Sequence, residues 1–122
     1  MKIEVSNGEL LDRISILEIK KLNMQNADNL ANIEKEFLSI NPGVVDLFTK
    51  NGKEIKVIFL ELSKVNRILW DLENKVRDKS ITDKEFRKSS RMIFEYNEVR
   101  NQLKNDINII SGSSFKDIKE YR

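Results

Sequence analysis

Charged side chains recur at helical spacing within stretches that are otherwise apolar. Glu18 lies among Leu11, Ile14 and Leu17, and at about 100° per residue it falls inside the arc that a helix should bury. Arginine and lysine bind carboxylates and phosphates, and a glutamate can orient such a ligand. The residues that could form a ligand-binding groove in this way are Glu18, Trp70, Glu73, Arg77, Asn97, Arg100 and Lys104.

The same charges have a structural interpretation. An unpaired buried charge costs several kcal/mol, so inward charges in a helical protein are expected to pair. Glu18, Glu73, Arg77 and Arg100 would then form partly buried ion pairs that set the register of the helices. The sequence leaves both interpretations open: ion pairs between helices, or a pocket in which Arg77, Arg100 and Lys104 hold a small anionic ligand.

The composition removes several kinds of chemistry. The chain has no cysteine and no histidine, which excludes disulfides, thiolate zinc sites and the Ser-His and Cys-His catalytic arrangements. An enzyme would have to use carboxylates, lysine, arginine, tyrosine, serine or threonine. We therefore predict no metal and no cofactor, and leave enzymatic activity open.

Charge and hydropathy limit the partners. The net charge is only +2, and acidic and basic residues are interleaved, unlike the basic surface of a nucleic-acid-binding protein. The longest apolar run, VIFL at residues 57–60, is too short to cross a bilayer. We expect a cytoplasmic protein that binds neither nucleic acid nor membranes.

Two patterns in the sequence give only a weak indication of an enzyme. Glu9 with Asp12, and Glu95 with Glu98, are similar to the magnesium-binding carboxylates of all-helical nucleoside triphosphate pyrophosphohydrolases. Their order and separation do not match that family. A mutase similar to chorismate mutase would also use inward bases, but the spacing of the available bases cannot be aligned with that pattern: Arg13, Lys20 and Arg100.

Four helices are predicted to position these residues. Ser6 and Glu9 have the spacing of a capping box, so the first helix should span residues 7–25. The second should begin after Asp28 and stop at a turn at residues 41–43, Asn-Pro-Gly, because proline and glycine interrupt helices. Residues 44–52 receive no assignment.

The third helix, residues 54–79, carries the strongest structural signal. Its apolar residues follow a heptad seam made of Ile55, Ile58, Leu62, Val65, Leu69, Leu72 and Val76. Thr82 and Glu85 form a second capping box, so a fourth helix should run from there to about residue 110 and end at Gly112, a left-handed C-cap.

Long helices with short connections pack as antiparallel neighbours. We therefore predict one all-α domain over residues 1–122, an up-and-down antiparallel bundle of about four helices, with a short extended segment possible at residues 1–5. Ile16 and Ile19 lie opposite Ile14, and Phe94 lies opposite Leu103. A helix with two apolar faces is either central in its bundle or buried in a dimer, and we predict a homodimer.

The chain resembles a family of short bacterial and phage proteins, the domain-of-unknown-function family number six-one-six-five. The matching stretches are SNGELLDRISILEIK at 6–20, VNRILWDLENKVRDK at 65–79 and YNEVRNQLKNDINIISGSS at 96–114. The resemblance assigns characteristic positions to Ser6, Gly8, Glu9, Asp12, Glu18, Lys20, Asn66, Trp70, Glu73, Arg77, Asn97, Arg100, Lys104, Asn108, Gly112 and Tyr121. It implies one helical domain and a shared polar site, but no activity or ligand.

From these observations we expect a helical binding or interaction module, homodimeric, with a charged groove between helices. Its partner would be a protein or a small anionic ligand. The alternative is a small enzyme or anion-binding protein that uses the same groove, either mutase-like or a magnesium-dependent nucleotide hydrolase.

Overall fold

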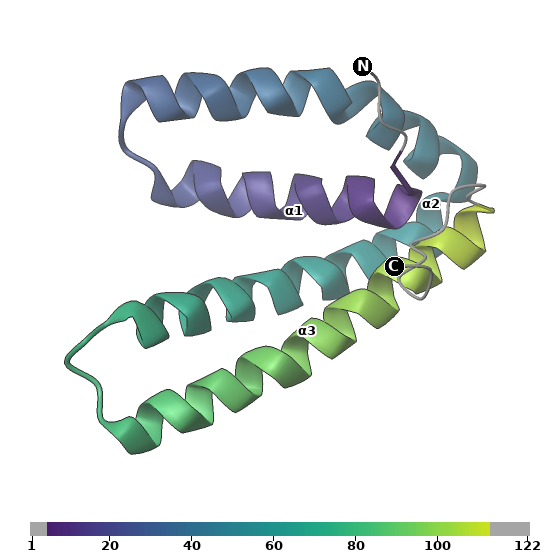
Figure 1. Cartoon of the computed structure of the whole chain (residues 1–122). Helices are drawn as coiled ribbons and strands as arrows, with labels where there is room; N and C mark the ends of the chain where they lie inside the picture. Colours follow the sequence, from purple (N-terminus) through teal and green to yellow (C-terminus); the bar gives the residue numbers. More distant parts are fainter. Residues whose placement is uncertain (1–4, 113–122) are drawn as a thin grey trace.

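The computed structural model describes residues 5–112, and this part of the chain forms three helices and no strand (Figure 1). They are α1 (Asn7–Asn23), α2 (Ala27–Arg77) and α3 (Asp83–Ser111). The first half of α2 turns back along α1, and α3 turns back along the second half of α2. The molecule is thus two helical hairpins that share α2 and diverge from one end. The predicted extended segment at residues 1–5 lies almost entirely outside the described residues.

Three helix ends agree with the sequence. The Ser6 hydroxyl accepts a hydrogen bond from the Glu9 amide at 3.1 Å, and Thr82 accepts one from the Glu85 amide at the same distance. Gly112 has a left-handed conformation, φ 62°, and ends α3. These caps satisfy amides and carbonyls that a helix end leaves free. The start of α2 differs, because Asn26 rather than Asp28 is its cap.

The prediction of about four helices is wrong, because α2 continues through the predicted turn. It is 51 residues long and contains Pro42. A proline inside a helix removes one hydrogen-bond donor and costs about 3 kcal/mol. Apolar residues on both sides of it, Ile40 and Val44, nevertheless face the same core, and their burial offsets that cost. The chain bends instead at Asn51, whose φ of −131° and ψ of 32° are not helical, so α2 consists of two helical segments joined at this kink.

The core lies where the two hairpins join, a region that we call the vertex. It is built from all three helices, and its buried residues are Leu11, Ile14, Val44, Leu47, Ile55, Leu62 and Ile107. Phe48 and Phe59 pack edge to face beside it, with ring centroids 5.7 Å apart. The start of α1, the irregular part of α2 and the end of α3 are held together there.

The position of α1 explains its two apolar faces. It lies between the two halves of α2 (Figure 1) and also contacts α3, so Ile14 and Ile19 are both buried. Its central place confirms one of the two alternatives that the sequence left open for this helix. Phe94 of α3 has no such neighbour and is 63% exposed.

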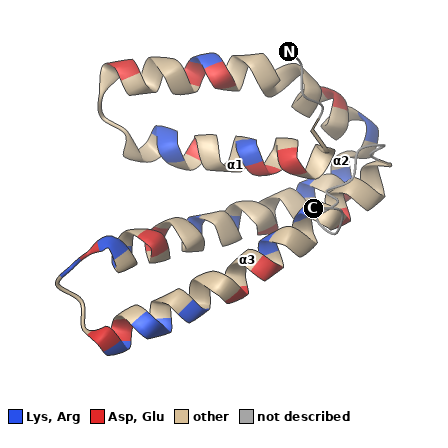
Figure 2. Cartoon of the chain, in the orientation of Figure 1, with Lys and Arg blue, Asp and Glu red and all other residues tan. Residues whose placement is uncertain are grey.

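Charged residues of both signs are interspersed along all three helices (Figure 2). None of the helices in residues 5–112 combines the length and the apolar character that a membrane span requires.

Candidate functional site

The first turn of α1 packs very closely on the last third of α3. A Cβ atom added to Gly8 would lie 2.3 Å from the Lys104 carbonyl oxygen, so only glycine fits. The Gly8 amide donates a hydrogen bond to Asn108 Oδ1 at 2.7 Å, and the ammonium of Lys104 forms an ion pair with Glu9. These contacts set the register of α1 against α3.

One turn further along α1, a buried polar network links the three helices. Arg100 Nε and Nη2 donate to Asp12 Oδ1 and Oδ2 at 2.8 and 2.6 Å, the two-pronged geometry that guanidinium and carboxylate favour. Asn66 Nδ2 donates to Asp12 Oδ1 at 2.9 Å and to Ser15 Oγ at 2.6 Å. The Asp12 side chain is 4% exposed and that of Arg100 is 25% exposed. The arrangement holds the guanidinium in one orientation.

The electrostatic environment favours the charged form of Arg100 beside Asp12. The hydrogen bonds with Asp12 raise the pKa of the Arg100 guanidinium above its ordinary value, against the effect of burial, and the negative charges of Asp12, Glu9 and Glu73 raise it further. Arg100 therefore keeps its charge, and the Asp12 carboxylate balances it.

Arg100 also borders a pocket of about 210 Å³ between α1 and the α2–α3 hairpin, which we call the inter-hairpin pocket. Its lining residues are Ile16, Ile19, Lys20, Asn66, Leu69, Trp70, Glu73 and Arg100. Each helix supplies one charged residue: Lys20 from α1, Glu73 from α2 and Arg100 from α3. Lys20 and Glu73 form no ion pair with any residue of the described chain.

The sequence-predicted site residues separate into two groups. Trp70, Glu73 and Arg100 line the inter-hairpin pocket. Asn97 does not line the pocket but accepts a long hydrogen bond, 3.4 Å, from Arg100 Nη1. Lys104 is buried and paired with Glu9. Neither Arg77 nor Glu18 lines the pocket, and both are exposed.

The expectation that Glu18 belongs to the buried stripe is wrong. Its side chain is exposed, although partial burial raises the pKa of its carboxyl. The buried carboxylate of α1 is Asp12. Leu11 and Ile14 of the predicted arc are buried, but α3 approaches α1 on the side of Gly8, and the carboxylate that it meets there is Asp12.

The sequence did contain a signal for the side of α1 that faces α3. Gly8, Asp12, Ser15 and Ile19 follow one another at steps of four, three and four, the spacing of a packing seam. Small and polar residues in such a seam permit close approach and hydrogen bonds between helices. Lys20, although among the family positions, was not among the predicted site residues.

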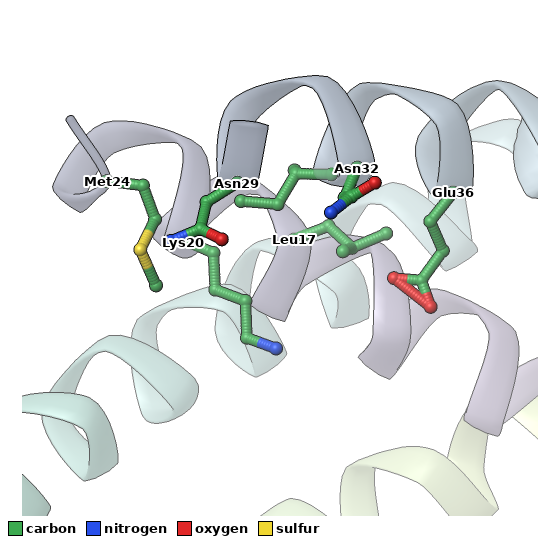
Figure 3. Close-up of a pocket in the computed structure, with 7 residues that line it drawn as sticks. Leu17, Lys20, Met24, Asn29, Asn32 and Glu36 are labelled. Carbon is green, nitrogen blue, oxygen red and sulfur yellow. The ribbon is translucent and has the colours of Figure 1, made fainter. Parts of the chain in front are cut away.

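A second hollow, of about 450 Å³, lies within the first hairpin (Figure 3). It is lined by Leu17, Lys20, Met24, Asn29, Asn32, Ile33 and Glu36. Figure 3 shows the Lys20 side chain running away from the amides of Asn29 and Asn32. Glu36 is held by an ion pair with Arg13, so Lys20 is the one lining charge here without a partner among the described residues. Fewer free charges converge on this hollow than on the inter-hairpin pocket.

The enzyme-like patterns do not assemble in the described residues. Glu9 and Asp12 are each paired with a base, while Glu95 and Glu98 are exposed on α3. No group of three or more acidic residues within residues 5–112 is close enough to hold a metal ion. Of the bases that a mutase-like site would use, Lys20 and Arg100 line the pocket, whereas Arg13 lies outside it.

Comparison with known proteins places the chain in a family. No curated protein and no solved structure matches it significantly. The sequence model described as "Family of unknown function (DUF6165)" matches residues 1–122, the family that the sequence resemblance indicates. The chain therefore belongs to this family of unknown function, DUF6165.

Proposed function

We propose that the protein is a binding module and that the inter-hairpin pocket is its ligand site. The observation that carries the proposal is the convergence of Lys20, Glu73 and Arg100, one from each helix, on a pocket with apolar walls. Binding sites commonly combine an apolar lining with a few polar groups that fix the orientation of the ligand. The half-buried Trp70 adds a flat surface for an apolar or planar part of the ligand.

The two interpretations of the inward charges apply to different residues. Ion pairs between helices account for Asp12 with Arg100 and for Glu9 with Lys104. They do not account for Lys20 and Glu73, which border the same pocket and have no ionic partner within residues 5–112. The structural pairs therefore hold Arg100 in place, and the unpaired charges beside it are available to a ligand.

The remaining expectations of the sequence stay predictions. They are the homodimer, a protein partner and the cytoplasmic location. The enzyme alternative gains no support from the carboxylate pairs, because their members are paired with bases or lie exposed on α3.

The proposal is tested by a thermal-shift screen of the full chain with nucleotides, divalent metal salts, small carboxylates and amino acids. A ligand that binds only the folded state at about 100 times its Kd stabilises the protein by about 2.7 kcal/mol. The variant Glu73→Ala removes a pocket charge. Its matched control is Glu61→Ala, which changes another exposed glutamate of the same helix outside the pocket.

We expect at least one compound to raise the Tm of the unmodified protein and of Glu61→Ala, and to lose this effect in Glu73→Ala. The proposal fails if no compound raises the Tm. It also fails if every stabilising compound acts equally on both variants.

A further inference from the structure

The charges around the inter-hairpin pocket are balanced in sign. Arg100 is bound by both oxygens of Asp12, so it adds hydrogen-bond donors without much net charge. The two charges left without an ionic partner among the described residues are opposite in sign and come from different helices, Lys20 on α1 and Glu73 on α2. Such a pocket is neutral overall and presents both a cation and an anion to a ligand.

This balance disfavours a strongly anionic ligand. Of the three bases that the sequence proposed for an anion, Arg77 does not line the pocket and Lys104 is paired with Glu9. A phosphate or a dicarboxylate would therefore meet one unpaired cation together with the Glu73 carboxylate. Like charges at short range repel, and more strongly in a partly buried pocket than in water.

The volume points to a small ligand. The pocket, about 210 Å³, lies below the range of about 300–1,000 Å³ that is typical of sites for drug-sized ligands.

We propose that the inter-hairpin pocket binds a small zwitterion of the free amino acid class, an inference that rests on the proposed function of this pocket. The carboxylate of the ligand would lie between Lys20 and the Arg100 guanidinium, and its ammonium would lie against Glu73. The side chain of the ligand would contact Leu69 and Trp70, which form the apolar wall. Each charge of the ligand then meets an opposite charge that the protein leaves unpaired.

The test uses the full chain and isothermal titration with the twenty standard amino acids. The one that binds most tightly is then compared with its N-acetyl derivative, which lacks the ammonium, and with its amide, which lacks the carboxylate. A hydrogen bond between charged groups that is lost on one side corresponds to roughly tenfold weaker binding or more. We expect both derivatives to show this loss with the unmodified protein.

Two pocket variants sharpen the result. In Glu73→Gln the N-acetyl derivative should bind as well as the amino acid, because no carboxylate remains to be satisfied. In Lys20→Met the difference in affinity between the amino acid and its amide should become smaller, because the cation that binds the carboxylate is gone. The matched controls Glu61→Gln and Lys64→Met change exposed residues of α2 outside the pocket, and they should leave the preference for the amino acid over its derivatives unchanged. The helical signal in circular dichroism should be the same in all four variants.

The outcomes separate this inference from the proposed function. If nucleotides or carboxylates stabilise the protein through Glu73 while amino acids do not bind, the pocket is a ligand site but not for zwitterions. The inference also falls if an amino acid and its two derivatives bind equally. If no compound of any class binds, both proposals are wrong.

Discussion

The vertex and the arms of the molecule use the same residue types in opposite ways. At the vertex, Glu9 and Lys104, and Asp12 and Arg100, form ion pairs that cross between helices. Further from the vertex, the hairpins diverge into two arms (Figure 1), and two of the charges that border the inter-hairpin pocket, Lys20 and Glu73, have no ionic partner within the described chain. Where helices converge, desolvation forces charges to pair. Where helices diverge, a charge can stay solvated until a ligand covers it.

The largest test of this comparison is Gly8→Ala. Alanine is the better helix former by about 1 kcal/mol, so local propensity alone predicts stabilisation. At this position the new methyl group would lie 2.3 Å from the Lys104 carbonyl oxygen, and neither backbone can move without separating α1 from α3. We expect a loss of about 3 kcal/mol or more in the free energy of unfolding, measured in urea.

Gly52→Ala is the matched control, since an added Cβ meets nothing within 4 Å there. This variant should be neutral or slightly more stable. Equal losses for both glycines would show that close packing at the vertex is not what distinguishes Gly8.

Asp12→Asn is expected to lower the free energy of unfolding by less than Gly8→Ala does. The change keeps the shape of the side chain but leaves the Arg100 guanidinium without its counter-charge in a site where Asp12 is 4% exposed. Breaking a buried pair costs about 3–5 kcal/mol. Because Arg100 is 25% exposed, water can replace part of the lost interaction, and we expect about 2 kcal/mol.

The exposed pair of Arg13 and Glu36 is the comparison for that loss. Arg13→Ala should cost less than about 1 kcal/mol in the same denaturation experiment. If it costs as much as Asp12→Asn, burial is not what gives the vertex pairs their importance.

Features that depend on neighbouring residues were predictable from the sequence. The caps at Ser6, Thr82 and Gly112 are present where their spacing placed them. The heptad seam of the second half of α2 is also confirmed, with Ile55, Leu62, Val65, Leu69 and Leu72 buried. Caps and seams are set by spacing within one helix, and the sequence contains that information directly.

Features that depend on a distant helix were not predictable in the same way. The turn expected at Pro42 is replaced by continuous helix, because the apolar residues around it reach a core that α1 and α3 complete. Local propensity cannot include burial that another segment supplies.

The candidate site shows the same limit. Trp70, Glu73 and Arg100 were predicted from their places on helix faces, and all three line one pocket. Glu18 was chosen instead of Asp12 because a helix packed on several sides has no single apolar stripe from which its interior can be read. The close approach at Gly8, which decides the side that faces α3, is a contact between residues almost a hundred positions apart.

Glu18 gives the smallest expected effect and the sharpest test of the boundary between the two regions. Partial burial raises the pKa of its carboxyl above the ordinary 4.5, so between that value and the raised pKa the folded state binds more protons than the unfolded state. Stability then falls as the pH rises through this interval. Above it, Glu18→Gln should raise the Tm slightly, because a neutral amide escapes the desolvation of a charge.

Below pH 4 the two proteins should melt together, since the carboxyl is protonated in both states. Thermal unfolding followed by circular dichroism from pH 3 to pH 8 measures the difference, and Glu61→Gln, a change at an exposed glutamate of α2, serves as the control. A Tm that falls in Glu18→Gln at neutral pH would mean that the charge of Glu18 contributes to holding the helices together. Glu18 would then belong with the paired charges of the vertex, and the boundary between the two regions would lie further along α1 than the contacts of Asp12 place it.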